Sequence, residues 1–113
     1  MKQEFIDYLN DIFDSIQKIE IFTKDMSFKK FEKDDKTIFA VVRALEIIGE
    51  ASKKIPDNIK QKHSNIPWKS MAGMRDKLIH EYFGVDVKVL WKTIEQDVPP
   101  LKNAFQKLLE IYK

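Results

Sequence analysis

Apolar side chains recur at intervals of three and four residues along most of this chain, and this spacing most constrains its fold. In residues 4–22 the apolar positions form one stripe and polar side chains cover the other side, which is typical of an amphipathic helix. The same spacing recurs in residues 35–53, 68–82 and 87–112. Three glycines and four prolines in 113 residues leave little room for β-hairpins. The pattern therefore predicts an all-α fold.

Capping residues indicate where the first helices begin. Ser27 is suited to cap a short helical turn over residues 28–31, and Asp34 or Asp35 is suited to cap a helix that runs to about Lys53. The helix expected to end near Lys53 is apolar over more than half of its circumference. We therefore expect it to lie centrally in a bundle.

Prolines and a glycine divide the second half of the chain. Residues 56–66 are expected to form a loop with one helical turn, after which Pro67 suits the first turn of a new helix and Gly84 its end. Asp86 is suited to cap the last helix, which Pro99-Pro100 must kink or split. The whole pattern predicts one domain over residues 1–113, an antiparallel bundle of four main helices plus a short helix.

Composition excludes several classes of protein. The absence of cysteine rules out disulfides, zinc–thiolate sites and cysteine nucleophiles. No apolar run approaches the ~20 residues of a membrane span, and the acidic, amphipathic first residues do not resemble a signal peptide. A net charge of +2 among 34% charged residues argues against a strong general binder of polyanions but leaves room for a local basic site. We expect a cytoplasmic protein that does not contact membranes.

An arginine lies on the apolar face of the helix that begins at Trp68. Arg75 follows Trp68 by seven residues and precedes Tyr82 by seven, so the three positions nearly eclipse one another. A guanidinium among apolar neighbours is costly unless it is paired or faces a cleft. Asp76 and His80 are four residues apart and can touch. Arg75 and His80 are five apart, roughly 140° around the helix axis, so they flank a strip of surface.

Structural roles would also explain these side chains. Arg75 could pair with Glu46 or Glu50, His80 could stabilise a helix C-terminus, and Tyr82 could be a core aromatic whose hydroxyl finds a partner. The residue types alone therefore give a helical bundle with an unusual polar cluster on one helix, and they do not specify a reaction.

Other polar and aromatic residues are assigned structural or surface roles. His63 lies in a polar loop beside lysines, and we expect it to be solvated. Trp68 and Trp91 are expected in the core. Arg43 and the two glutamates that follow it on one helix stripe are expected to form a solvated or inter-helix charge cluster.

Three segments of the sequence form a distinctive combination. Residues 66–86 read IPWKSMAGMRDKLIHEYFGVD, residues 45–51 read LEIIGEA, and residues 89–91 read VLW. Together they resemble the HepT-like branch of the HEPN superfamily. An arginine and a histidine separated by four residues would be weak evidence alone. The combination of these segments is much more specific, and the resemblance extends over essentially the whole chain.

This resemblance implies an enzyme and a way of silencing it. HEPN proteins of this branch are metal-independent endoribonucleases that act as toxins of toxin–antitoxin pairs, with no cofactor, and a minimal nucleotidyltransferase is their partner. It implies that Arg75 and His80 are the catalytic pair, that two protomers dimerise around a shared cleft, and that the partner adds AMP to Tyr82. The family often has asparagine where this chain has Asp76, and an acid there could orient His80 but could also repel phosphate.

The residue types fit this chemistry. Metal-free RNA cleavage uses the 2′-hydroxyl as the nucleophile, so the protein supplies a proton shuttle, for which histidine is suited. It also supplies a fixed cation for the charge on the phosphorane, for which arginine is suited. The alternative from another class is a non-catalytic helical module that partners a nucleotidyltransferase. In that case Arg75 and His80 would bind a nucleotide or hold an interface. His80→Ala should abolish RNA cleavage if the chain is a nuclease, and it should leave partner binding intact in either case.

Overall fold

The computed structural model describes residues 2–80 and 86–112, with side chains for residues 5–74 and 86–112. Every regular element within these ranges is helical, which confirms the predicted all-α class. The elements are α1 (Lys2–Thr23), α2 (Phe28–Glu32), α3 (Asp35–Lys53), α4 (Asp57–Lys62), α5 (Trp68–His80), α6 (Val87–Lys92), the π-helical turn η2 (Thr93–Asp97) and α7 (Val98–Tyr112). None of the helices in the described part has both the length and the apolar character needed to cross a bilayer.

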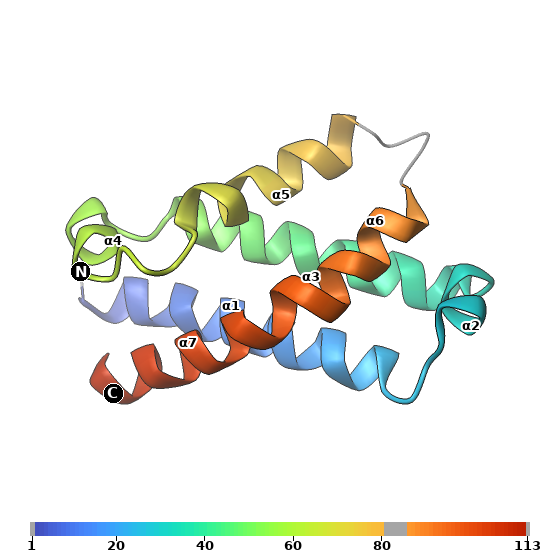
Figure 1. Cartoon of the computed structure of the whole chain (residues 1–113). Coiled ribbons are helices and arrows are strands. Elements are labelled where there is room, and N and C mark those ends of the chain that lie inside the picture. The colour runs from blue at the N-terminus through green and yellow to red at the C-terminus, as the bar shows by residue number, and fades with distance from the viewer. Residues whose placement is uncertain (1, 81–85, 113) are drawn as a thin grey trace.

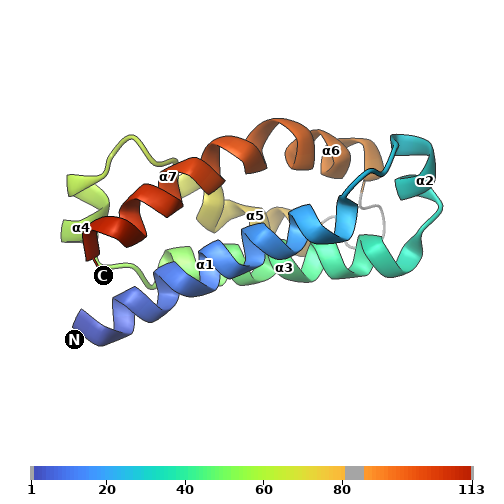
Figure 2. The same cartoon turned by 90° about the horizontal axis from the view of Figure 1, so that it is seen from below.

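The helices form an elongated bundle that measures 42 × 29 × 21 Å. Helices α1 and α3 run side by side in opposite directions, and α5 and α7 pack on them (Figure 1). The view from below shows that α4 and both chain ends lie at one end of the bundle and α2 at the other (Figure 2). The prediction named one short helix, whereas the described residues contain three α-helices of five or six residues. Residues 57–62 form α4 instead of a single turn, and the turn η2 separates α6 from α7.

Helix α1 buries the stripe that its sequence predicts. Leu9, Ile12, Ile16 and Ile19 are fully buried, and burial of each such side chain contributes about 1.5–3 kcal/mol to the stability of the fold. At the end of the helix the hydroxyl of Thr23 donates to the carbonyl oxygen of Ile19 at 2.7 Å. This bond satisfies a buried polar group within the helix itself.

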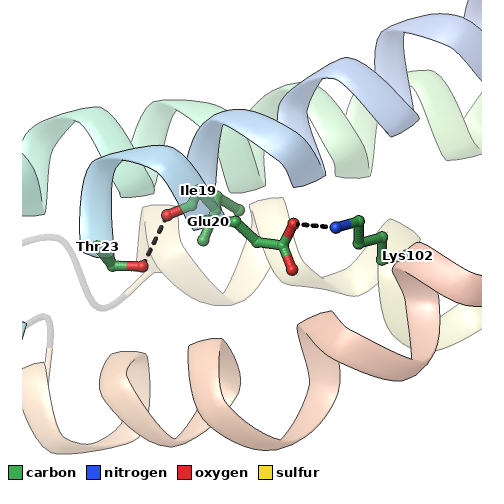
Figure 3. A network of polar contacts seen from close by, with 4 residues as sticks. All are labelled: Ile19, Glu20, Thr23 and Lys102. Carbon is green, nitrogen blue, oxygen red and sulfur yellow. Dashed lines mark hydrogen bonds and ion pairs between the residues drawn. The ribbon is translucent and has the colours of Figure 1, made fainter. Parts of the chain in front are cut away.

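An ion pair joins α1 to α7 on the outer side of this stripe. The Nζ atom of Lys102 lies 2.9 Å from Oε1 of Glu20, close to the Ile19–Thr23 hydrogen bond (Figure 3). Both side chains are more than one-third exposed. The pair therefore contributes little to stability and mainly links the two surfaces.

Side-chain caps fix the start of α2 and α3 as the sequence predicts. The hydroxyl oxygen of Ser27 accepts from the N–H of Lys30 at 3.3 Å. Asp34, and not Asp35, caps α3, since its carboxylate accepts from both the N–H and the hydroxyl of Thr37 at 3.0 and 2.8 Å. These bonds to the charged form lower the pKa of Asp34 below its ordinary value.

Helix α3 lies centrally, packed between α1 and α5 (Figures 1 and 2). Val41, Leu45 and Ile48 are buried along it, and Gly49 is buried in its interior. Phe39 differs from this pattern, since 71% of its surface is exposed. The apolar arc of α3 is thus wider than the part of its surface that the neighbouring helices cover.

The last helical element changes geometry before its two prolines. The N–H of Val98 donates to the carbonyl oxygen of Thr93, five residues back, and a π-helical turn separates α6 from α7. Pro99 and Pro100 cannot donate a hydrogen bond, and in an α-helix their rings would clash with the carbonyls four residues earlier. The predicted disturbance at these prolines is therefore present, as a widened turn immediately before them.

Candidate active site

Helix α5, which carries the predicted catalytic pair, is anchored at its first turn. The indole N–H of Trp68 donates to the carbonyl oxygen of His63 at 3.0 Å, and the indole ring packs edge-on against Phe105 of α7 with centroids 5.6 Å apart. Trp68 is buried as predicted, and Met71 on the next turn is fully buried. The start of α5 is thus fixed to α7 and to the residues that follow α4.

The backbone places Arg75 and His80 on the same unbroken helix. Arg75 follows buried Trp68 by seven residues, and His80 follows exposed Gly73 by seven. Because seven residues are close to two turns, Arg75 occupies a register position on the buried side of α5 and His80 one on the exposed side. The two positions lie about 7.5 Å apart along the axis.

The other predicted site residues are described to different extents. Asp76 follows Arg75 within α5. Tyr82 and Gly84, at the predicted end of this helix, lie outside the described residues. Glu46 and Glu50, the acids with which Arg75 could pair, are half-buried on α3, the helix against which α5 packs. A pairing of Arg75 with either acid stays a prediction.

A groove opens beside the first half of α5. It has a volume of about 400 Å³ and lies between α5 and the segment formed by η2 and the start of α7. Its apolar lining consists of Ile66, Pro67, Met71, Met74, Pro100, Leu101 and Ala104. Polar side chains at the groove come from Asn65, Ser70, Gln96 and Asp97. Sequence reasoning missed this groove because its two walls are about thirty residues apart in the chain.

The environments of His63 and Trp91 differ from the predictions. The prediction of a solvated His63 is wrong, because its Nε2 atom lies 2.9 Å from the hydroxyl oxygen of Tyr112 and its ring contacts the Tyr112 ring. Trp91 is only partly buried, and its ring packs against Phe31 with centroids 5.0 Å apart. His63 thus joins the end of α4 to the end of α7.

Among the side chains that the structure describes, in residues 5–74 and 86–112, no group of three or more histidine, aspartate or glutamate residues is arranged to hold a metal ion.

The fold and this helix define a class of protein, namely a small helical bundle with an arginine and a histidine five residues apart on one helix. The ribonuclease HepT-like family matches residues 12–108. The chain therefore belongs to this family, which confirms the predicted HepT-like resemblance and the prediction of an RNA-cleaving hydrolase.

Individual relatives are similar over nearly their whole length. A protein of Thermococcus cleftensis named probable ribonuclease HepT is 60% identical over 108 residues, which covers 96% of this chain and 98% of that protein. A putative RNase of Methanocaldococcus jannaschii is 45% identical over 96% of this chain and 94% of its own length. A putative RNase of Caldanaerobacter subterraneus is 46% identical over 91% of this chain and 92% of its own length. No solved structure matches the chain.

Proposed function

We propose that this chain is a metal-independent endoribonuclease in which Arg75 and His80 form the catalytic pair. The observation that carries the proposal is the continuity of α5, which holds both backbone positions on one helix in a member of a ribonuclease family. The first turn of that helix is buried and hydrogen-bonded through Trp68. A catalytic pair on an anchored helix is held more accurately than one on a loop.

The proposed reaction is an internal transfer at phosphorus. The 2′-oxygen of one nucleotide attacks the adjacent phosphorus while its proton moves to a base, and the bond from phosphorus to the 5′-oxygen breaks as that oxygen gains a proton. His80 supplies the proton transfer, and Arg75 stabilises the negative charge that builds on the phosphorane oxygens. The products are a 2′,3′-cyclic phosphate and a 5′-hydroxyl.

The active unit in this proposal is a homodimer. Arg75 and His80 occupy different sides of one helix, so a single copy does not present both toward the same point. Two α5 helices paired across a two-fold axis would surround one phosphate with two copies of each residue. The exposed surface at Gly73, on the same side of the helix as the His80 position, leaves room for such an approach.

The proposed regulation is covalent. A cognate minimal nucleotidyltransferase adds AMP to Tyr82, and the added bulk and negative charge block RNA. The two proteins would then form a cytoplasmic toxin–antitoxin pair, with this chain as the toxin. Support for this part of the proposal comes from the resemblance in residues 66–86, which includes the tyrosine two residues after His80.

The experiment is RNA cleavage by purified protein in EDTA, with no partner present. Intact mass first establishes that Tyr82 carries no AMP. We expect cleavage that persists at any EDTA concentration and leaves 2′,3′-cyclic phosphate ends. Cleavage that stops in EDTA and returns with a divalent metal, or products with 3′-hydroxyl ends, would overturn the proposed mechanism.

A further inference from the structure

The groove beside α5 owes its polar wall to the π-helical turn. Gln96 and Asp97 both belong to η2, which forms immediately before Pro99 and Pro100. Single π turns within helices are rare and occur frequently at functional sites. Here the turn is part of the groove wall that faces α5, the helix that carries the proposed catalytic pair.

The size and lining of the groove fit a small, flat, partly apolar ligand. Its volume of about 400 Å³ lies within the range of ligand sites, roughly 300–1,000 Å³. Met71 and Leu101 are buried in its apolar part, whereas Asn65, Gln96 and Asp97 are exposed. An apolar surface with a few polar groups at its edge is the usual arrangement for binding an aromatic ring and fixing its orientation.

The polar groups restrict which ring can bind. The carboxylate of Asp97 only accepts hydrogen bonds, while the amides of Asn65 and Gln96 both donate and accept. Carboxylates in nucleic-acid complexes accept from exocyclic amino groups, and amides pair with the edge of adenine. The negative charge of Asp97 also disfavours a phosphate at this place. The groove therefore suits a nucleobase and not the backbone of RNA.

The groove adjoins the proposed catalytic pair along α5. Met74 lines it, and Arg75 is the next residue of the helix. His80 follows Met74 by six residues, about 9 Å along the helix axis. A base held at Met74 and a phosphate held in the proposed dimer cleft, to which Arg75 of the same chain contributes, are thus close enough to belong to neighbouring nucleotides.

We infer that this groove binds one nucleobase of the RNA substrate and prefers bases that carry an exocyclic amino group over uracil. The inference rests on the proposed ribonuclease function and adds a specificity site to it. Asp97 acts as the specificity-determining residue, with Gln96 and Asn65 as further hydrogen-bonding groups. Met74 and Pro100, which are at least partly exposed at the groove, supply apolar surface on which the base lies.

The test is an NMR titration of the labelled full chain with adenosine, cytidine and uridine, which lack phosphate. We expect shifts in the amides of residues 65–74 and 96–104, with uridine binding at least about fivefold more weakly. Asp97→Asn should remove this difference between nucleosides. Glu95→Gln removes an equal charge from the same π turn at a residue that does not line the groove, and it should leave the difference unchanged.

A second variant tests the inference by filling the groove with a larger side chain. Ala104 lines the groove and is only partly buried, so Ala104→Leu fills it without replacing a core side chain. We expect this variant to lose nucleoside binding while its unfolding curve stays close to that of wild type. The inference is wrong if no nucleoside shifts these amides, if Asp97→Asn leaves the preference intact, or if Ala104→Leu instead splits a wild-type dimer.

Cleavage assays separate this inference from the proposed function. If nucleosides bind as expected but wild type does not cleave RNA, the catalytic proposal fails and the base site remains. If wild type cleaves RNA but nucleosides do not bind, the base site alone fails. If both hold, Asp97→Asn should change the bases next to the cleaved bond, whereas Glu95→Gln should cleave beside the same bases as wild type.

Discussion

His63 and Tyr112 lie 49 residues apart in the chain and join through a contact of 2.9 Å between the imidazole Nε2 and the phenolic oxygen. The same tyrosine ring packs edge-on against Phe5 of α1, with centroids 5.2 Å apart. Tyr112 therefore connects the C-terminal end of the chain to α4 and to α1, at the end of the bundle where both termini lie (Figure 2).

Tyr112→Phe should lower the free energy of unfolding by about 0.5–1.5 kcal/mol, because it removes one partly buried hydrogen bond and keeps the aromatic ring. Urea denaturation measures this difference. Tyr112→Ala removes the ring contacts with His63 and Phe5 as well, and it should cost clearly more. Equal stability of wild type and Tyr112→Phe would show that the hydroxyl contact contributes nothing.

Gly73→Ala should raise the stability of the isolated protein by about 1 kcal/mol, since alanine favours a helix interior and an added Cβ at this position meets nothing within 4 Å. Thermal unfolding should show a midpoint several degrees higher. Gly49→Ala is the matched control, because that glycine is buried in α3 and an added methyl group there should destabilise the fold. A fall in the midpoint for Gly73→Ala would contradict the exposed position described for this residue.

Asp34 should make the free energy of unfolding depend measurably on pH in the acidic range. Its hydrogen bonds from Thr37 lower the pKa of the folded carboxyl below the ordinary value, so the stabilisation is fully present above about pH 4 and is lost as the pH falls through the lowered value. Asp34→Asn can still cap α3 but does not titrate. The difference in unfolding free energy between wild type and this variant should shrink toward acidic pH. A difference that is constant from about pH 6 to about pH 2 would contradict this assignment.

Tyr82→Phe should separate cleavage from silencing. The variant lacks the hydroxyl that accepts AMP in the proposed regulation, so it should cleave RNA as wild type does and remain active with the nucleotidyltransferase and ATP. Intact mass should show the addition of AMP to wild type and none to the variant. Silencing of Tyr82→Phe by the same partner would place the modification at another residue.

The features that sequence predicted correctly depend on neighbours in the chain. The caps formed by Ser27, Asp34 and Asp86 close hydrogen bonds within two or three residues, so local chemistry is enough to predict them. The stripe of α1 is predictable for the same reason, since one face of a helix recurs every three to four residues.

The missed features depend on residues far apart in the chain. Nothing near His63 indicates that Tyr112 approaches it. The two prolines indicate a disturbance in the last helix but not that it takes the form of a π turn. The groove forms only where residues 65–74 meet residues 96–104. Arg75 and His80 are assigned from a resemblance over many residues, because the residue types alone fit structural roles at least as well, such as an ion pair of Arg75 with a glutamate of α3.

The catalytic roles of Arg75 and His80 are tested most directly by comparing wild type, Arg75→Ala and His80→Ala in single-turnover RNA cleavage with EDTA present and the partner absent. Circular dichroism and partner binding serve as controls for folding. We expect His80→Ala to lower the rate constant by about 10²–10⁴-fold and Arg75→Ala by a comparable factor, while both variants stay folded and bind the nucleotidyltransferase. Folded variants that cleave RNA at the wild-type rate would contradict the claim that Arg75 and His80 form the catalytic pair.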